Sequence, residues 1–284
     1  MRKVVVIGSK GMAGHVIYHY LKEHTTLKIV DIARGSDFHN PSHKIDVTDF
    51  EKLTEVLEEE NPDFVINCVG ILNKDAEDNP EKSILLNCYF PHFLAKIGKA
   101  ISFRLIHIST DCVFDGKRGG YTEASLKDGK GLYAETKSLG EVTYGDNLTI
   151  RTSIIGPELK KEGIGLFHWF MNQKGKVRGY TNAYWTGITT IELAKVIIAA
   201  IDEDITGLHH VVNNEKINKY DLINLFKQIF NKTDIEIEPF ADYSIDKSLI
   251  KTNDSFKYVV PSYKQMLQEM SVWIEEKRSL YKVY

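Results

Sequence analysis

The N-terminal segment constrains the fold more than any other part of the chain. Lys3–Ile7 is a short, mostly β-branched run with the composition of a buried parallel strand, and it leads directly into a glycine-rich turn. Apolar residues at helical spacing follow from Val16 to Leu21. A strand, a glycine turn and a helix N-terminus together direct backbone N–H groups and the helix dipole toward an anion. The segment therefore predicts a phosphate cradle at the start of an α/β fold.

The residues around this turn predict a dinucleotide as the ligand. Gly8, Gly11 and Gly14 have the spacing G-x-x-G-x-x-G, which differs from the more familiar G-x-G-x-x-G. A second strand over 27–30 ends at Asp31, which is placed to bond a ribose 2′-hydroxyl. A glycine-rich turn without a ligand is the alternative interpretation.

The charges near the turn bear on the type of coenzyme. An acid at Asp31 normally disfavours a 2′-phosphate, whereas Lys10 and Arg34 could both pair with one. The balance favours NADP(H) over NAD(H) by a small margin.

Tyr133 and Lys137 form a candidate catalytic pair. They stand four residues apart, so on a helix their side chains share a face. An ammonium beside a phenol favours the phenolate, and we expect it to lower the tyrosine pKa from about 10. Such a phenol is a usable proton donor near neutral pH. A solvated helix face is the alternative for this pair taken alone.

A polar group follows another predicted strand, 103–108. Ser109, Thr110 and Asp111 stand at its carboxyl end, where open α/β sheets bind their ligands. The Thr110 hydroxyl could orient a carbonyl oxygen near Tyr133, and a helix cap or turn residue is the alternative.

Together these motifs resemble the extended short-chain dehydrogenase/reductase superfamily, and within it the dTDP-4-dehydrorhamnose reductases. Ser109–Gly116 is similar to the signature S-T-D-Y-V-F-D-G of that family, with Cys112 where tyrosine is usual. Asn67–Gly70 stands where the family has a strand end beside the nicotinamide ribose, and Arg151–Gly156 resembles its segment after the sixth strand. The likeness is strong over residues 1–156, moderate to about 205 and weak beyond.

The resemblance implies roles for individual residues. Thr110, Tyr133 and Lys137 match the catalytic residues of the family, and Asp46–Val47 resembles a pair that flanks the adenine, with a strand-end cap as an equal alternative. The expected coenzyme contacts are Gly8, Lys10, Gly11, Met12, Gly14, Asp31, Arg34, Asp46, Val47, Cys68, Val69, Gly70, Tyr133 and Lys137. The expected substrate contacts are Thr110, Asp111, Cys112, Tyr180, Asn182 and Trp185.

Composition narrows the class of protein. The net charge is −3 with mixed signs, so no nucleic-acid surface is expected. No apolar run approaches the roughly 18 residues of a membrane helix, and Met1–Lys3 begins no signal-peptide pattern. The three cysteines lack CxxC spacing, which favours reduced thiols and a cytoplasmic protein.

The 10 histidines raise the question of a metal. His15 and His19 share a helix face, and His39 and His43 flank Pro41 in a predicted loop, but neither pair has a third ligand nearby. We expect these residues and the adjacent His209–His210 to be solvated surface histidines, and we expect no metal site.

Strands that alternate with helices predict a Rossmann-type, doubly wound parallel sheet with a smaller α+β C-terminal lobe. The predicted dinucleotide-binding domain covers residues 1–155 and is completed by about 178–205, and the lobe takes 156–177 and 206–284. Further strands are predicted at 44–46, 63–67 and 148–151, and helices at 48–60, 79–99, 166–172, 190–202, 217–230 and 261–277. The polar, aromatic stretch 179–187 is predicted to be a substrate-binding loop.

These observations predict an NAD(P)H-dependent oxidoreductase that reduces the 4-keto group of a nucleotide-diphosphate 4-keto-6-deoxy sugar. Such a reaction would make deoxysugars for surface polysaccharide, and a homodimer is left open. A 4,6-dehydratase or epimerase is one alternative, which Cys112 weakens because it replaces the usual glutamate after Thr110-Asp111. A reductase-like regulatory subunit is the other, although such proteins often lose the tyrosine or lysine that this chain keeps.

Overall fold

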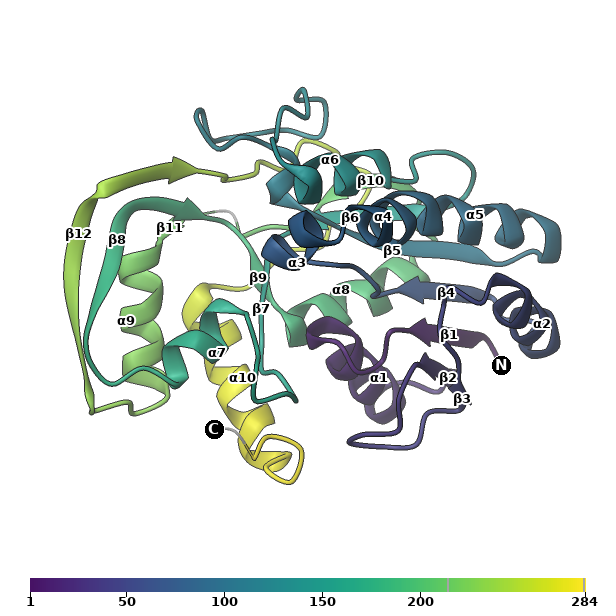
Figure 1. The fold of residues 1–284 in the computed structure, drawn as a ribbon, viewed down its shortest axis with the longest axis horizontal. Helices are drawn as coiled ribbons and strands as arrows, with labels where there is room; N and C mark the ends of the chain where they lie inside the picture. Colours follow the sequence, from purple (N-terminus) through teal and green to yellow (C-terminus); the bar gives the residue numbers. More distant parts are fainter. Residues whose placement is uncertain (214, 283) are drawn as a thin grey trace.

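A computed structural model describes residues 1–213, 215–282 and 284, and its centre is a sheet of seven parallel strands (Figure 1). The strand order is β10-β6-β5-β4-β1-β2-β3. The bounds along this order are Gly207–His210, Leu148–Thr152, Arg104–Thr110, Phe64–Asn67, Lys3–Ile7, Lys28–Ala33 and His43–Lys44. The order reverses direction at β1, so β1 and β4 end at the switch point where such sheets bind ligands. The predicted Rossmann-type sheet is confirmed.

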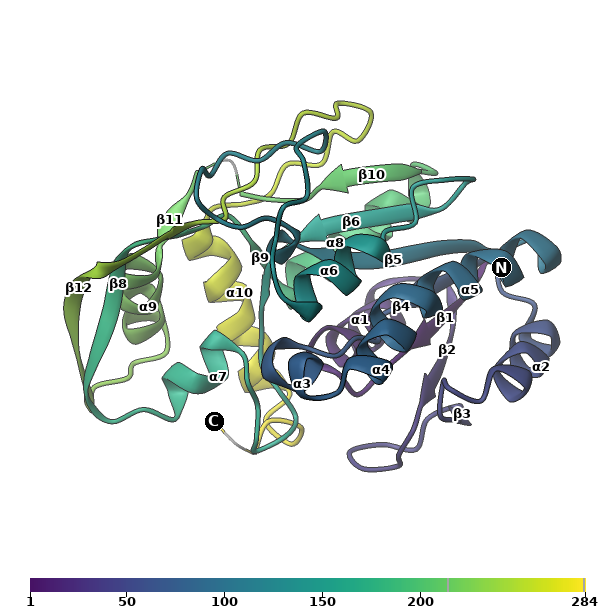
Figure 2. The ribbon, with the colours of Figure 1, turned by 45° about the horizontal axis from the view of Figure 1, so that its top comes forward.

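Both faces of the sheet are buried under helices. In β1, Val4 and Val6 belong to one apolar cluster, whereas Val5 and Ile7 belong to another on the opposite face. Helices α1 (Met12–His24) and α8 (Thr190–Asp202) cover the first face. Helices α2 (Phe50–Glu60), α5 (Phe90–Ile101) and α6 (Leu132–Leu139) lie over the second face (Figure 2). This burial explains why β1 reads as a continuous apolar run.

The chain between β4 and α5 is more broken than its sequence predicts. Helix α3 (Asn73–Asp78) precedes α4 (Pro80–Ser83), and a π-helical segment, Ile84–Tyr89, joins α4 to α5. The predicted single helix over 79–99 therefore consists of α4, the π-helical segment and α5, and α3 precedes it as an additional short helix. Short π-helical segments inside helices are often found at functional sites. Helix α2, predicted to begin at residue 48, begins at Phe50. Its N-cap is Asp49, whose side chain accepts from Lys52 N.

The C-terminal lobe has its own sheet, in the order β11-β8-β12. Strands β8 (Gly175–Trp185), β11 (Ile217–Asn218) and β12 (Ile235–Asp246) form it, with helices α7 (Leu166–Met171), α9 (Lys219–Ile229) and α10 (Tyr263–Glu276) alongside. The prediction of a loop at 179–187 is wrong, because most of it is strand. Val177, Gly179, Ala183 and Trp185 are buried on one face with partly exposed residues between them, which is the period of a strand.

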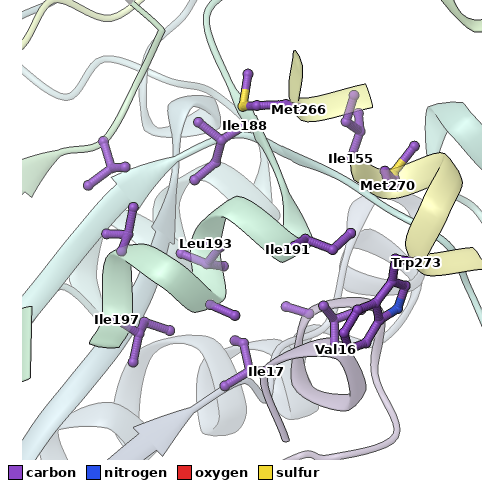
Figure 3. Close-up of a cluster of buried hydrophobic side chains, with 14 of the residues drawn as sticks. Val16, Ile17, Ile155, Ile188, Ile191, Leu193, Ile197, Met266, Met270 and Trp273 are labelled. Carbon is purple, nitrogen blue, oxygen red and sulfur yellow. The ribbon is translucent and has the colours of Figure 1, made fainter. Parts of the chain in front are cut away.

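The two parts of the molecule do not divide where the sequence suggested. Strand β8 belongs to the lobe, whereas β10 adds an edge strand to the main sheet. A two-stranded sheet of β7 (Ile154–Ile155) and β9 (Ile188–Thr189) links them. Side chains from α1, α8, α10 and this small sheet pack into one apolar cluster (Figure 3), which the labelled residues Val16, Ile17, Ile155, Ile188, Ile191, Leu193, Ile197, Met266, Met270 and Trp273 outline.

Several histidines lie inside the protein, which corrects the surface prediction. His15 on α1 and His209 and His210 on β10 are buried, and each has at least one hydrogen-bond partner in the protein. Across the described ranges, no group of three or more histidine, cysteine or acidic residues is arranged to hold a metal. None of the helices in those ranges is both long and apolar enough to span a bilayer.

Candidate active site

A cavity of about 360 Å³ opens at the carboxyl ends of β4, β5 and β6, beside the N-terminus of α1. It brings together residues that are up to about two hundred positions apart in the sequence. Of the predicted site residues, those in its wall are Gly11, Met12, Cys68, Val69, Gly70, Thr110, Asp111, Cys112, Tyr133, Lys137 and Trp185.

The glycine turn is shaped for close backbone approach. Gly8 has φ +85, and a Cβ at Gly14 would collide with the carbonyl oxygen of Gly8, so both positions require glycine. Helix α1 begins at Met12 with no side-chain cap and no acid in its first turn. No side chain of the cap or first turn competes for the free N–H groups at this end of the helix. Together with the helix dipole, these N–H groups favour the binding of an anion.

Thr110 is a turn cap, as one of its two sequence interpretations predicts, and it also lines the cavity. Its Oγ1 accepts from Cys112 N at 3.1 Å, which caps the short 3₁₀ turn Asp111–Val113, and it donates to Asp111 Oδ1 at 3.2 Å. The hydroxyl is thereby held at the carboxyl end of β5, in the wall of the same cavity as Tyr133.

Lys137 lies one helical turn from Tyr133 on α6 but turns toward β5. Its Nζ donates to Ile108 O at 2.8 Å and lies 3.4 Å from His107 Nε2. Burial lowers the pKa of Lys137 to about 8. A small change in the surroundings of this buried ammonium therefore changes its charge near neutral pH.

The expected low pKa of Tyr133 is wrong for this coenzyme-free arrangement. Burial raises the pKa of Tyr133 well above its ordinary value, the nearby Cys112 and Asp111 add to the rise, and the Thr110 hydroxyl opposes it only in part. The Lys137 ammonium points to Ile108 O of β5 and is not among the groups that lower the pKa of Tyr133. The phenol is consequently protonated at neutral pH.

Asp31 is engaged inside the protein. Its carboxylate is fully buried and accepts from Ser9 Oγ at 2.6 Å, from His39 Nε2 at 2.8 Å, and from Ser42 N and Oγ at 2.9 Å. Burial by itself would raise the pKa of Asp31, but these hydrogen bonds outweigh it and lower the pKa. Asp31 thus ties the loop after β2 to the glycine turn.

The other predicted coenzyme residues lie outside the cavity wall. Lys10 Nζ donates to Gly35 O at 2.6 Å, and Arg34 pairs weakly with Asp46 at 3.8 Å on the surface. Asp46 Oδ1 also accepts from the Thr48 hydroxyl, as the strand-end cap interpretation predicts. Gly8, Gly14 and Val47 are likewise absent from the wall.

Two predicted substrate residues are not at this cavity. Tyr180 packs against Phe240 and Tyr243 of the lobe sheet, and Asn182 Nδ2 donates to Ala241 O at 3.0 Å. Both residues lie in β8, which runs along the lobe sheet and reaches the cavity only at its last residue, Trp185.

The cavity also contains residues that the sequence did not indicate. Lys219 enters from the N-terminus of α9, and Glu158 enters from the loop after β7, where its Oε1 accepts from Gly165 N at 2.7 Å. Lys219 appears in the sequence as the first turn of an amphipathic helix, so no local signal distinguishes it. Only the packing of the lobe on the sheet places it here.

The residues present fit a dinucleotide. The close approach of Gly14 to Gly8 and the uncapped α1 N-terminus provide the anion cradle, and Cys68, Val69 and Gly70 extend the wall from there toward Tyr133 and Lys137.

Comparison with known proteins agrees with this geometry. The profile of the RmlD substrate binding domain matches residues 1–270. The chain belongs to this family. Its resemblance to dTDP-4-dehydrorhamnose reductases is confirmed at that level.

Curated relatives of the chain differ in their described roles. A "probable low-salt glycan biosynthesis reductase Agl14" of Haloferax volcanii is 27% identical over 232 residues, which cover 76% of each protein. A dTDP-4-keto-6-deoxy-D-glucose reductase of Streptomyces niveus is 26% identical, with 78% of this chain and 76% of the relative covered. Methionine adenosyltransferase 2 subunit beta of Rattus norvegicus is 24% identical, with 85% and 76% covered.

Solved structures share the whole architecture. A hypothetical dTDP-4-dehydrorhamnose reductase from Sulfolobus tokodaii superposes with a TM-score of 0.77 at 26% identity, over 93% of this chain and 98% of the other. A dTDP-4-dehydrorhamnose reductase from Bacillus anthracis, in complex with NADP, gives a TM-score of 0.81 at 19% identity, over 98% and 100%. The latter shows the fold alone.

Proposed function

We propose that this family member is an oxidoreductase that uses NAD(P)H to reduce the 4-keto group of a nucleotide-diphosphate 4-keto-6-deoxy sugar. The observation that carries the proposal is the convergence of Thr110, Tyr133 and Lys137 in one cavity with the N-terminus of α1. A proton donor, a residue that positions it and an anion cradle are the parts that a coenzyme-dependent carbonyl reduction requires.

Each catalytic residue has a distinct task. When bound, the reduced nicotinamide supplies hydride to the carbonyl carbon. Thr110 holds the carbonyl oxygen beside Tyr133, and Tyr133, protonated at neutral pH, gives its proton to the oxygen as negative charge develops there. Lys137 binds the coenzyme ribose, and its charge then favours the phenolate that the proton transfer leaves behind.

The coenzyme in this proposal is NADP(H) rather than NAD(H). All the hydrogen bonds that hold Asp31 come from Ser9, His39 and Ser42, so its carboxylate is turned away from the role of binding a ribose hydroxyl. With that acid occupied, the two cations nearest the predicted ribose site, Lys10 and Arg34, set the preference for a 2′-phosphate.

A test of this preference uses Lys10→Met and Arg34→Met. Removing either charge should weaken NADPH binding by about 10- to 100-fold, the scale of a charge-assisted hydrogen bond, and leave NADH binding nearly unchanged. Equal losses for the two coenzymes would show that these lysine and arginine side chains do not recognise the phosphate.

One alternative function has a specific observation in its favour. The alignment with rat methionine adenosyltransferase 2 subunit beta covers 85% of this chain, so a role as a reductase-like subunit of another enzyme is the competing function. The dehydratase alternative is weaker, because burial raises the pKa of the Cys112 thiol to about 11 and leaves no base at that position near neutral pH.

Coenzyme stoichiometry separates these functions. Candidate 4-keto nucleotide sugars, formed in place by a dehydratase, are mixed with the protein and NADPH while absorbance at the reduced-nicotinamide band is followed. A reductase consumes one coenzyme per sugar, whereas a dehydratase or epimerase consumes none and a regulatory subunit turns over nothing. Absence of coenzyme oxidation with every 4-keto sugar would reject the proposed function.

The proposal places this activity in the cytoplasm, on a small-molecule substrate and without a nucleic-acid partner. The three cysteines are free thiols, which suits a reducing compartment. A homodimer remains compatible with it.

A further inference from the structure

Lys219 is a cation that the lobe delivers into the active-site cavity. It is the first residue of α9, whose N-cap, Asn218, accepts from Asp221 N at 2.8 Å. Its side chain lines the cavity together with Asp111, Cys112 and Trp185. The proposed mechanism does not use this residue.

The Lys219 ammonium has no partner of its own in the described part of the chain. No hydrogen-bond acceptor and no carboxylate within ion-pair distance contacts it there, and its Nζ lies over the Trp185 ring, 5.0 Å from the centroid. Two other lysines of the lobe are paired: Lys216 with Asp246 and Lys176 with Glu238, both at 2.7 Å.

An unpaired ammonium in such a wall is unfavourable without a ligand. Burial lowers the pKa of Lys219 to about 8, although the neighbouring Asp111 and Cys112 oppose the shift. Lys219 is partly buried, and a partly buried charge is stabilised when an anion enters and supplies the missing partner. The cavity is therefore prepared for a negatively charged group at this end.

The two cavity lysines have separate surroundings. Lys137 projects from α6 and donates to Ile108 O of β5, whereas Lys219 projects from the lobe helix α9 and has Asp111 and Cys112 as neighbours. In the proposed mechanism Lys137 binds the coenzyme, so an anion beside Lys219 is assigned to the substrate. The diphosphate carries the negative charge of a nucleotide sugar.

A second lysine strengthens the positive field. Lys247, directly after β12, also acts on Asp111 and Cys112, and no ion pair or hydrogen bond of its ammonium occurs within the ranges described. The Asp111 carboxylate, which accepts from Thr110, reduces the field. Lys219 and Lys247 together outweigh the single carboxylate of Asp111, so this end of the cavity has a net positive charge. Such a field favours a diphosphate, which carries two negative charges.

We propose that Lys219 is a substrate-recognition residue that binds the diphosphate of the nucleotide sugar, with Lys247 adding to the field. This inference rests on the proposed function for the identity of the substrate. It assigns the recognition of the diphosphate to the lobe and the recognition of the coenzyme to the main sheet.

Direct binding to the NADP⁺-loaded protein tests the assignment. Calorimetry with dTDP, UDP and thymidine compares ligands with and without the diphosphate. Wild-type protein should bind at least one diphosphate much more tightly than thymidine. Lys219→Met should weaken that diphosphate by about 10- to 100-fold, whereas Lys219→Arg should retain most of the affinity.

The matched control is Lys216→Met, which removes a lysine of the same lobe that is already paired with Asp246. It should leave diphosphate binding unchanged, and all variants should keep the wild-type melting temperature and NADP⁺ affinity. Unchanged dTDP and UDP affinity in Lys219→Met, or no wild-type binding of either, would overturn the inference.

The two proposals fail in different ways. A wild-type protein that reduces 4-keto sugars, with unchanged KM in Lys219→Met, would reject only the role of Lys219. Diphosphate binding that depends on Lys219, in a protein that oxidises no NADPH with any 4-keto sugar, would reject only the reductase activity.

Discussion

At the scale of single residues, the site works through side chains whose charge is controlled by burial. Burial raises the pKa of Tyr133, so the phenol stays protonated, and it lowers the pKa of Lys137 to about 8, close to neutral pH. Thr110 donates to Asp111 and caps the turn after β5, and it lines the same cavity as Tyr133. The identities of these residues were predictable from short motifs, but their protonation states were not, because burial depends on the whole fold.

Tyr133→Phe tests the proton donor. The change removes one hydroxyl and keeps the ring, so coenzyme binding and melting temperature should stay near wild type. Loss of a general acid should lower kcat by about 10²- to 10⁴-fold. Steady-state kinetics with a reducible 4-keto sugar measure this, and a variant with wild-type kcat would refute the assignment.

The Lys137 ammonium makes coenzyme affinity depend on pH. Its lowered pKa means that the coenzyme-free protein loses this charge as the pH rises through about 8, whereas an unfolded lysine would keep it until about 10.5. Because the charged form binds coenzyme, affinity should fall above pH 8 by up to about tenfold per pH unit. Titrations from pH 6.5 to 9.5 should show this fall in wild type and in Lys219→Met, but a flat profile in Lys137→Met.

At the scale of elements, the C-terminal segment supports the glycine turn from behind. His15 Nδ1 donates to Gly11 O at 2.8 Å, which leaves Nε2 to accept from the Tyr281 hydroxyl at 2.9 Å. Tyr281 in turn accepts from Trp273 Nε1 at 2.8 Å. Burial lowers the pKa of His15 to about 4, so this chain of hydrogen bonds has one direction at neutral pH.

Tyr281→Phe removes the central hydroxyl of this chain without changing the volume of the core. His15 and Trp273 each lose a buried partner, so we expect about 1–3 kcal/mol less unfolding free energy and several-fold weaker coenzyme binding. Tyr258→Phe is the control, because its hydroxyl donates to the buried Glu192 at 2.7 Å, away from the glycine turn. A coenzyme Kd that changes equally in both variants would mean that the effect is one of general stability.

The elements also show what the sequence could predict. The helix 190–202 and the strands of the main sheet other than β10 were predicted closely, since apolar runs and helical periodicity are local signals. The edge strand β10 was missed, because its residues were assigned to the lobe. The stretch 179–187 was misassigned, because glycines and polar aromatics indicate a loop unless the pairing of β8 with β11 and β12 is known. The π segment Ile84–Tyr89 and the site role of Lys219 likewise depend on contacts distant in sequence.

At the scale of the whole molecule, a continuous core connects the coenzyme side to the lobe. Helices α1, α8 and α10 share one apolar cluster with the small β7–β9 sheet (Figure 3). The active-site cavity lies where this core ends, with walls from the main sheet and from the lobe. Because both walls of the cavity rest on this core, we expect a loss of core packing to weaken the binding of substrate and of coenzyme together.

Trp185 stands at this junction and tests the coupling. Its side chain is 3% exposed, packs near Tyr263 and lies under Lys219, yet it also reaches the cavity wall. Trp185→Ala should lower the unfolding free energy by about 3–5 kcal/mol, the usual cost of removing a buried aromatic ring. Denaturant unfolding measures this, and a stable variant with only a raised substrate KM would instead support a pure binding role.

Transfer of deuterium from coenzyme to sugar tests the central claim most directly. The protein is given reduced coenzyme deuterated at the transferring position of the nicotinamide and a 4-keto-6-deoxy nucleotide sugar, and the product is analysed by mass spectrometry. Our account predicts one deuterium at C4 of the sugar for each coenzyme oxidised, and loss of both in Tyr133→Phe. A product without deuterium, or sugar conversion without coenzyme oxidation, would contradict it.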